Sequence, residues 1–214
     1  MRATLTAGVP NAPVRTASTG VWIGVATISM SFAAYTSALV VRQGASGDWL
    51  HFRLPAILYA NTLLLVASSV TLEVARRNHM PSGTGQGADV IALPGPLSRT
   101  VGWLDATLGL GLLFVLGQVV AWRQLAAQGL YLSTNPSSAF FYILTAAHAL
   151  HLLGGMAALF YVRHRLRSAS VANRAGVTGY RLPAAIPALG AATLYWHFMG
   201  VLWLYLLLLL VVRL

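Results

Sequence analysis

The sequence predicts an all-α fold: an integral membrane bundle of five transmembrane helices that forms one domain over residues 20–214. The composition supports this prediction, because 57% of the 214 residues are hydrophobic, only 8% are charged and the mean hydropathy is +0.70. Five apolar runs also reach the length of about 20 residues that a helix needs to cross about 30 Å of hydrocarbon. They occupy residues 20–41, 55–75, 101–121, 138–162 and 187–212.

Turn-forming residues separate these runs. The clearest breaks are GASGD at 44–48, PSGTGQG at 81–87 and NPSS at 135–138. The first 19 residues hold two arginines and no separate hydrophobic core with a cleavage site, so we expect a retained cytoplasmic amino-terminal tail. The fourth connection, residues 163–186, is expected to be the one long basic loop.

The arginines predict the orientation of the bundle. All 14 basic residues are arginines, against four acidic residues. Ten arginines lie in the amino-terminal tail and in the second and fourth connections, and four lie on the opposite side. By the positive-inside rule we expect a cytoplasmic amino end and a periplasmic carboxyl end in a multi-pass protein of the bacterial inner membrane. Because the charge follows the connections, a nucleic-acid partner is not expected.

Two histidines stand in an otherwise apolar run, TAAHALHLLGG at 145–155. His148 and His151 share one helical stripe near the middle of the bilayer. A metal site normally needs three or four donors, and no carboxylate or cysteine accompanies this pair. A b-type haem would need His148 or His151 together with His197. We favour a third interpretation, in which each histidine packs and donates a hydrogen bond across a helix interface.

Four charged residues near helix ends have structural interpretations. Glu73 precedes Arg76 and Arg77 by three and four residues, which favours a local ion pair at the membrane interface over a proton-carrying role. Asp105 is expected near the start of the third helix, where a carboxylate complements the helix dipole.

Several uncharged polar side chains also fall inside or beside the apolar runs. They are expected to form hydrogen bonds between helices. These residues are Asn61, Thr62, Gln118 and Trp122.

Three segments together resemble subunit III of the haem-copper respiratory oxidases. They are NTLLLVASSVT at 61–71, FFYILTAAHALHLLGG at 140–155 and YWHFMGVLWLY at 195–205. The resemblance spans nearly all of residues 20–212. The chain looks like the short five-helix form of the family. The resemblance assigns a packing or lipid-adjacent role to the signature residues, which are Asn61, Thr62, Gln118, His148, His151, Tyr195, Trp196, His197 and Trp203.

The resemblance implies a non-catalytic accessory subunit of a cytochrome c or quinol oxidase. Its partners would be catalytic subunit I, which holds the haem and copper, and subunit II, together with membrane lipids. This chain would hold no redox cofactor. It would stabilise the catalytic subunit, bind structural phospholipid and support proton uptake during oxygen reduction. An accessory subunit of a nitric oxide reductase and a haem-b electron-transfer protein remain alternatives.

The chain departs from the family pattern at two acidic positions. Ser31 is followed by Phe32 where the family usually has a buried glutamate, and Gly200 stands where the last signature usually has aspartate. We therefore do not carry over the proton-collecting roles that those acids would imply.

Overall fold

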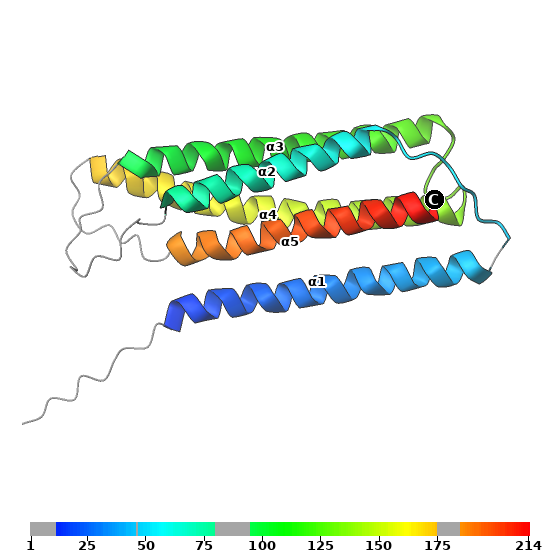
Figure 1. Ribbon diagram of the computed structural model, residues 1–214, viewed down its shortest axis with the longest axis horizontal. Helices are drawn as coiled ribbons and strands as arrows, with labels where there is room; N and C mark the ends of the chain where they lie inside the picture. The colour runs from blue at the N-terminus through cyan, green and yellow to red at the C-terminus, as the bar shows by residue number, and fades with distance from the viewer. Residues whose placement is uncertain (1–11, 46, 80–94, 175–184) are drawn as a thin grey trace, which may run out of the picture.

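The computed structural model describes residues 12–45, 47–79, 95–174 and 185–214. This part of the chain contains five helices: α1 (Ala12–Ala45), α2 (Ile57–His79), α3 (Gly95–Ala127), α4 (Pro136–Arg174) and α5 (Ala185–Arg213) (Figure 1). Each has a segment long and apolar enough to cross a membrane. The predicted all-helical fold, with five helices able to span a membrane, is therefore confirmed for the described residues. Residues 1–11 of the tail, the PSGTGQG segment and Arg181 lie outside the described residues.

The helices extend past the apolar runs. Helix α1 begins at Ala12, so residues 12–19 are helical, and α4 continues to Arg174 where the sequence suggested a loop from residue 163 onward. The expectation of a loop from residue 163 onward is wrong because an apolar run marks only the part of a helix that fits in hydrocarbon. Arginine, alanine and serine do not end a helix, and Arg165 Nε donates to the Tyr161 hydroxyl one turn earlier at 3.1 Å.

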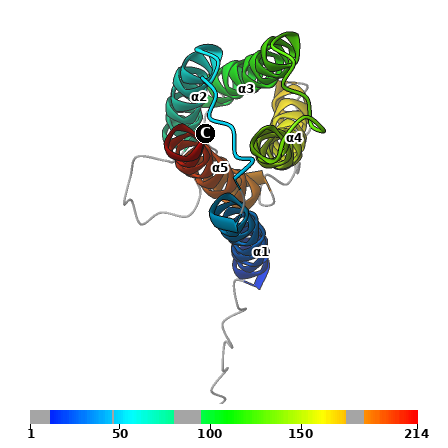
Figure 2. The ribbon, with the colours of Figure 1, turned by 90° about the vertical axis from the view of Figure 1, so that its right-hand side faces the viewer.

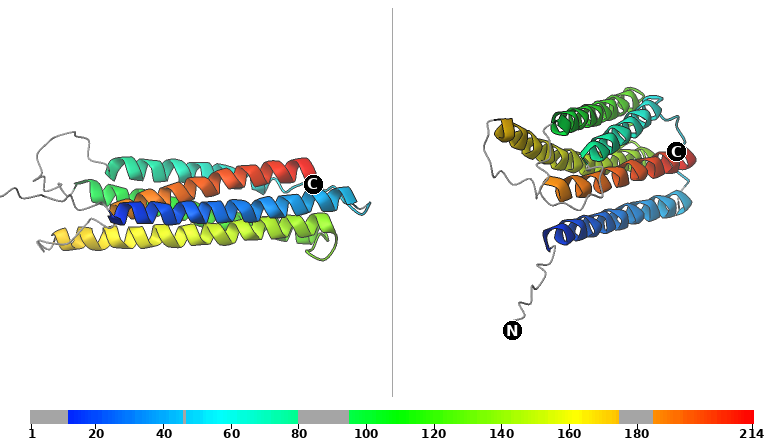
Figure 3. Two further views of the ribbon diagram at one scale, coloured as in Figure 1. Left: turned by 90° about the horizontal axis from the view of Figure 1, so that it is seen from below. Right: turned by 60° about the vertical axis from the view of Figure 1, so that its left-hand side comes forward.

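Four helices form a closed ring and one lies outside it. Each of α2, α3, α4 and α5 contacts the next, and α5 closes the ring against α2 (Figure 2). Among the described helices, α1 contacts only α4 and α5, and it runs along the outside of this pair (Figure 3). Its Phe32 side chain is 1% exposed and joins the core beside α4 and α5. The apolar core therefore lies inside the ring, with α1 attached to one side.

The connection between α3 and α4 has a clear stop and start signal. Gly129 has φ 77°, and the Gly129 and Leu130 amides donate to the Ala126 and Leu125 carbonyls at 3.0 and 3.1 Å. This is a Schellman motif, which ends a helix with a residue in the left-handed conformation that glycine adopts easily. Asn135 then caps α4, because its Oδ1 accepts the Ser138 amide at 2.9 Å just before a proline in the first helical position. This short connection makes α3 and α4 antiparallel neighbours.

The connection between α1 and α2 holds the end of α5. The Trp49 indole N–H donates to the Arg213 carbonyl at 2.9 Å, and the Phe52 amide donates to the Leu214 carbonyl at 2.9 Å. These bonds use carbonyls that the last turn of a helix leaves without partners. They tie α5 to the connection that leads out of α1.

Candidate functional site

The aromatic signature residues of α5 form hydrogen bonds to two neighbouring helices. The Tyr195 hydroxyl donates to the His151 carbonyl of α4 at 2.9 Å. The indole N–H of Trp196 donates to Ser68 Oγ of α2 at 3.1 Å, and that of Trp203 donates to Thr62 Oγ1 at 3.0 Å. Both tryptophans are almost fully buried. Inside a membrane an unpaired N–H is costly, so these bonds fix the position of α5 against α2 and α4.

The other two sides of the ring carry equivalent hydrogen bonds. Trp122 of α3 donates to Thr145 Oγ1 of α4 at 3.0 Å, and the hydroxyls of Thr71 in α2 and Thr107 in α3 lie 2.9 Å apart. All four sides of the ring therefore have at least one side-chain hydrogen bond between helices. The sequence identified the tryptophans but neither Ser68, which accepts the Trp196 N–H, nor Thr107, which pairs with Thr71. A lone serine or threonine in an apolar helix carries no distinctive pattern.

Two glycines make room for the aromatic residues of α5. A Cβ built on Gly155 of α4 would lie 2.9 Å from Tyr195 Cε1, and one built on Gly111 of α3 would lie 2.9 Å from Trp196 Cη2. A Cβ on the adjacent Gly154 would meet nothing within 4 Å. The glycines at 111 and 155 therefore allow the close helix approach that membrane bundles use.

The histidines do not bridge helices as expected. His148 is 0% exposed, and neither ring nitrogen has a hydrogen-bond partner among the described residues. His151 Nδ1 lies 2.7 Å from the Ala147 carbonyl of its own helix, and the His151 ring packs against Phe32 of α1. The prediction that these rings form hydrogen bonds across a helix interface is wrong. His148 points into an aromatic interior, and His151 Nδ1 bonds to a carbonyl one turn earlier in its own helix.

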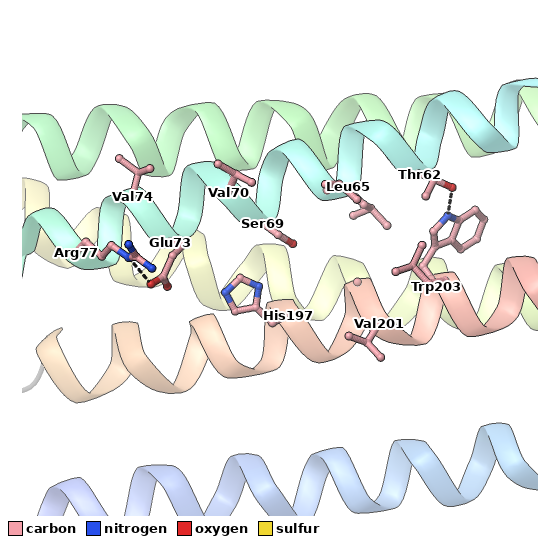
Figure 4. A pocket seen from close by; sticks show the side chains of 13 residues that line it. Thr62, Leu65, Ser69, Val70, Glu73, Val74, Arg77, His197, Val201 and Trp203 are labelled. Carbon is pink, nitrogen blue, oxygen red and sulfur yellow. Dashed lines mark hydrogen bonds and ion pairs between the residues drawn. The ribbon is translucent and has the colours of Figure 1, made fainter.

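The structure does not bring the histidines together as paired ligands. The His148 ring packs against the rings of both Phe114 and Trp203 inside the helix ring, with centroid distances of 5.8 and 5.1 Å. His197 instead lines a groove between α2 and α5 (Figure 4). Within the described residues there is no group of three or more histidine, aspartate or glutamate side chains arranged to hold a metal ion.

Glu73 forms ion pairs with both nearby arginines. Its Oε1 lies 2.7 Å from Arg76 Nη2 and 2.8 Å from Arg77 Nε. The Arg76 Nε also donates to Glu73 Oε2 at 2.8 Å. One carboxylate thus meets two guanidinium groups in the last turns of α2, which leaves one excess positive charge there.

Asp105 pairs with Arg163 of α4. Helix α3 begins at Gly95, ten residues before Asp105, so the carboxylate lies far beyond the first turn where a helix dipole acts. The dipole interpretation is therefore wrong, and the aspartate instead links α3 to α4.

A groove of about 510 Å³ lies between α2 and α5 (Figure 4). Six of its 13 lining residues are aliphatic, and the polar lining groups include Ser69, His197 and the Glu73–Arg77 pair at one end. A Cβ built on Gly200 would lie 3.5 Å from Ser69 Oγ, so these two residues face each other across the helix contact beside the groove. The aliphatic lining residues are Leu65, Val66, Val70, Val74, Val201 and Leu204.

Two of the polar residues expected to link helices behave differently. Gln118 is 1% exposed, and neither its Oε1 nor its Nε2 has a partner in the described part of the chain. Asn61 Nδ2 is likewise buried without a partner. The prediction that Gln118 forms a hydrogen bond between helices is wrong. Thr62 and Trp122 do form such bonds.

Comparison with known proteins finds relatives that are named subunit 3 of an oxidase. No family model matches the sequence. The chain is 30% identical over 176 residues to the probable cytochrome c oxidase subunit 3 of Mycobacterium tuberculosis H37Rv, covering 81% of this chain and 74% of the relative. It is 28% identical over 194 residues to the corresponding protein of Nocardia farcinica, covering 87% and 83%. It is 25% identical over 189 residues to the cytochrome bo(3) ubiquinol oxidase subunit 3 of Pseudomonas putida, covering 86% and 80%.

Proposed function

The chain belongs to the cytochrome c oxidase subunit 3 family, and we propose that it is a non-catalytic accessory subunit of a haem-copper terminal oxidase. Its partners would be catalytic subunit I and subunit II, in a complex that reduces oxygen and translocates protons. The haem and copper would belong to the catalytic subunit. The role of this chain would be to stabilise that subunit, to hold structural phospholipid and to support proton uptake during turnover.

One observation carries the scaffold role. The aromatic side chains of the last signature, Tyr195, Trp196 and Trp203, each donate a hydrogen bond that links α5 to another helix. Side chains committed to such bonds inside the ring are suited to fixing helix positions. The bonding pattern therefore supports a rigid accessory subunit.

The groove between α2 and α5 is the site that we propose for structural phospholipid. Its aliphatic lining suits an acyl chain, and the excess positive charge at the Glu73–Arg76–Arg77 cluster suits a phosphate. The Arg77 side chain is 76% exposed, so it can meet a headgroup at the membrane surface. Guanidinium groups bind phosphate through paired N–H donors.

The proposed orientation follows from the arginine distribution. The cluster of Glu73, Arg76 and Arg77 and the basic end of α4 would then lie on the cytoplasmic side, where anionic lipids attract positive charge. The carboxyl end of α5 would lie on the periplasmic side of a bacterial inner membrane.

The experiment that tests this proposal is recovery of the complex from native membranes through a tag on this chain, in mild detergent. Mass spectrometry is expected to find oxidase subunits I and II. Recovery of nitric oxide reductase subunits would assign the chain to the alternative complex, and recovery of the chain alone from membranes that contain active oxidase would contradict the proposal.

The same preparation tests the lipid site. Arg77→Gln should lower the amount of phospholipid retained per complex, because it removes the proposed phosphate contact. Arg165→Gln is the matched control, since Arg165 is also exposed but lies on α4, away from the groove. Equal lipid retention in the unmodified complex and both variants would refute the assignment of the groove, while leaving the subunit assignment to the recovery experiment.

A further inference from the structure

Three buried polar side chains inside the helix ring have polar atoms without a hydrogen-bond partner among the described residues. Asn61 of α2 and Gln118 of α3 are each 1% exposed, and His148 of α4 is 0% exposed. Five of their polar atoms have no hydrogen-bond partner in the described part of the chain: Asn61 Nδ2, Gln118 Nε2 and Oε1, and His148 Nδ1 and Nε2. We call these three residues the polar layer.

The first two members of the polar layer lie at one level of the ring. Asn61 packs directly on α3, because a Cβ built on Gly117 would lie only 2.1 Å from Asn61 Oδ1. Gln118 is the next residue of α3. The neighbour of Asn61 on α2 is Thr62, which accepts the Trp203 indole N–H at 3.0 Å and so places Trp203 at the same level.

The third member, His148, meets the same aromatic residues. Its ring centroid lies 5.8 Å from that of Phe114 and 5.1 Å from that of Trp203, and those two rings lie 4.8 Å apart edge to face. Phe114 is one helical turn before Gln118 on α3, so α3 presents both side chains to the same region. The polar layer thus gathers around the Phe114–Trp203 pair.

The chemistry of these side chains fits water. Each amide nitrogen offers two donors, the Gln118 oxygen accepts, and a neutral histidine has one donor and one acceptor in either tautomer. Water both donates and accepts, and buried waters typically make about three hydrogen bonds to polar groups that lack other partners. Leaving all of these groups unpaired in a membrane-embedded interior would be costly.

We propose that the polar layer is a binding site for ordered water that links α2, α3 and α4 inside the ring. Trp203 separates this site from the groove, because its ring contacts His148 on one side and lines the groove between α2 and α5 on another. The site therefore adds a hydrated connection among three helices to the direct bonds that fix α5. The inference does not depend on which oxidase or reductase subunits surround the chain.

Hydroxyl-radical footprinting of the intact complex tests the proposal. X-ray radiolysis of water next to a buried side chain labels that side chain even where bulk solvent has no access. Phe114 and Phe141 form a matched pair, since both are 0% exposed and only Phe114 adjoins the polar layer. Phe114 should be hydroxylated several-fold faster than Phe141. Labelling of Phe114 at no more than the rate of Phe141 would overturn the proposal.

Variants connect the labelling to the polar layer. The double variant Gln118→Leu with His148→Phe should reduce labelling of Phe114 to the level of Phe141. The double variant Gln124→Leu with His164→Phe is the control, because these exposed residues lie on the same two helices, and it should leave the labelling unchanged.

A density map of the unmodified complex gives a test that needs no variant. At a resolution that shows waters, a peak should lie within hydrogen-bond distance of a His148 nitrogen and of Gln118 or Asn61. Direct bonds among the three side chains with no such peak would overturn the proposal.

Discussion

The indole N–H of Trp203 in α5 donates to the hydroxyl of Thr62 in α2 across 3.0 Å. The Thr62 hydroxyl in turn donates to the Leu58 carbonyl one turn earlier at 2.9 Å. This arrangement joins two helices that are far apart in the sequence, and it places Trp203 between the polar layer and the groove. Residues from two signature segments of the family therefore form one contact that closes the helix ring.

Replacing Trp203 with phenylalanine should destabilise the subunit by about 1–3 kcal/mol. The change removes one hydrogen bond, worth about 0.5–1.5 kcal/mol, and leaves part of a buried ring volume unfilled. Thr62 keeps its bond to Leu58, so no new unpaired donor is created. Thermal unfolding of the purified complex measures the effect. Trp22→Phe is the control, because Trp22 is 59% exposed on α1 and should change the unfolding temperature little.

Gly155→Ala should also destabilise the subunit, by about 1–3 kcal/mol. The new methyl group would lie 2.9 Å from Tyr195 Cε1, so the tyrosine ring or the backbone would have to move.

The adjacent Gly154→Ala provides the control in the same unfolding measurement. Its methyl group would meet nothing within 4 Å, and alanine is preferred to glycine inside a helix by about 0.5–1 kcal/mol. Similar losses of stability in both variants would contradict the close-packing argument.

Asp105 and Arg163 should show energetic coupling. Asp105→Asn, Arg163→Gln and the double variant form a thermodynamic cycle in which the double variant loses less stability than the two single changes combined. Residues in direct contact typically couple by at least about 0.5 kcal/mol. Additive losses would contradict an energetic link between α3 and α4 through this ion pair.

Glu73→Gln should leave oxygen reduction and proton pumping unchanged. The carboxylate is already paired with Arg76 and Arg77, and such interfacial pairs contribute about 0–1 kcal/mol. Oxygen consumption and proton release by the reconstituted complex measure both activities. A large fall in pumping with normal assembly would instead support the proton-carrying role of Glu73.

The sequence predicted the spans well because hydrophobic length is a local property. The spacing of Glu73 from Arg76 and Arg77 likewise indicates neighbours on one helix, and these groups form ion pairs. Helix ends were harder to predict, as α4 shows by continuing to Arg174, because arginine-rich segments outside hydrocarbon can stay helical.

Contacts between helices could not be read from the sequence. Asp105 and Arg163 are separated by 58 positions, and their pairing depends on how α3 and α4 align. The same holds for His148, whose position against both Phe114 and Trp203 requires the arrangement of three helices. The pattern identified a polar group in an apolar run, but its surroundings depend on the tertiary packing.

The most direct test of the central claim is a reduced-minus-oxidised visible spectrum. It should be recorded on the complex recovered through a tag on this chain, on the isolated chain, and on a complex that carries His148→Leu and His151→Leu. The account predicts haem bands in both complexes, of equal size per catalytic subunit, and none in the isolated chain. Haem retained by the isolated chain, or lost from the assembled histidine variant, would show that these histidines are ligands and would contradict an accessory role without a redox centre.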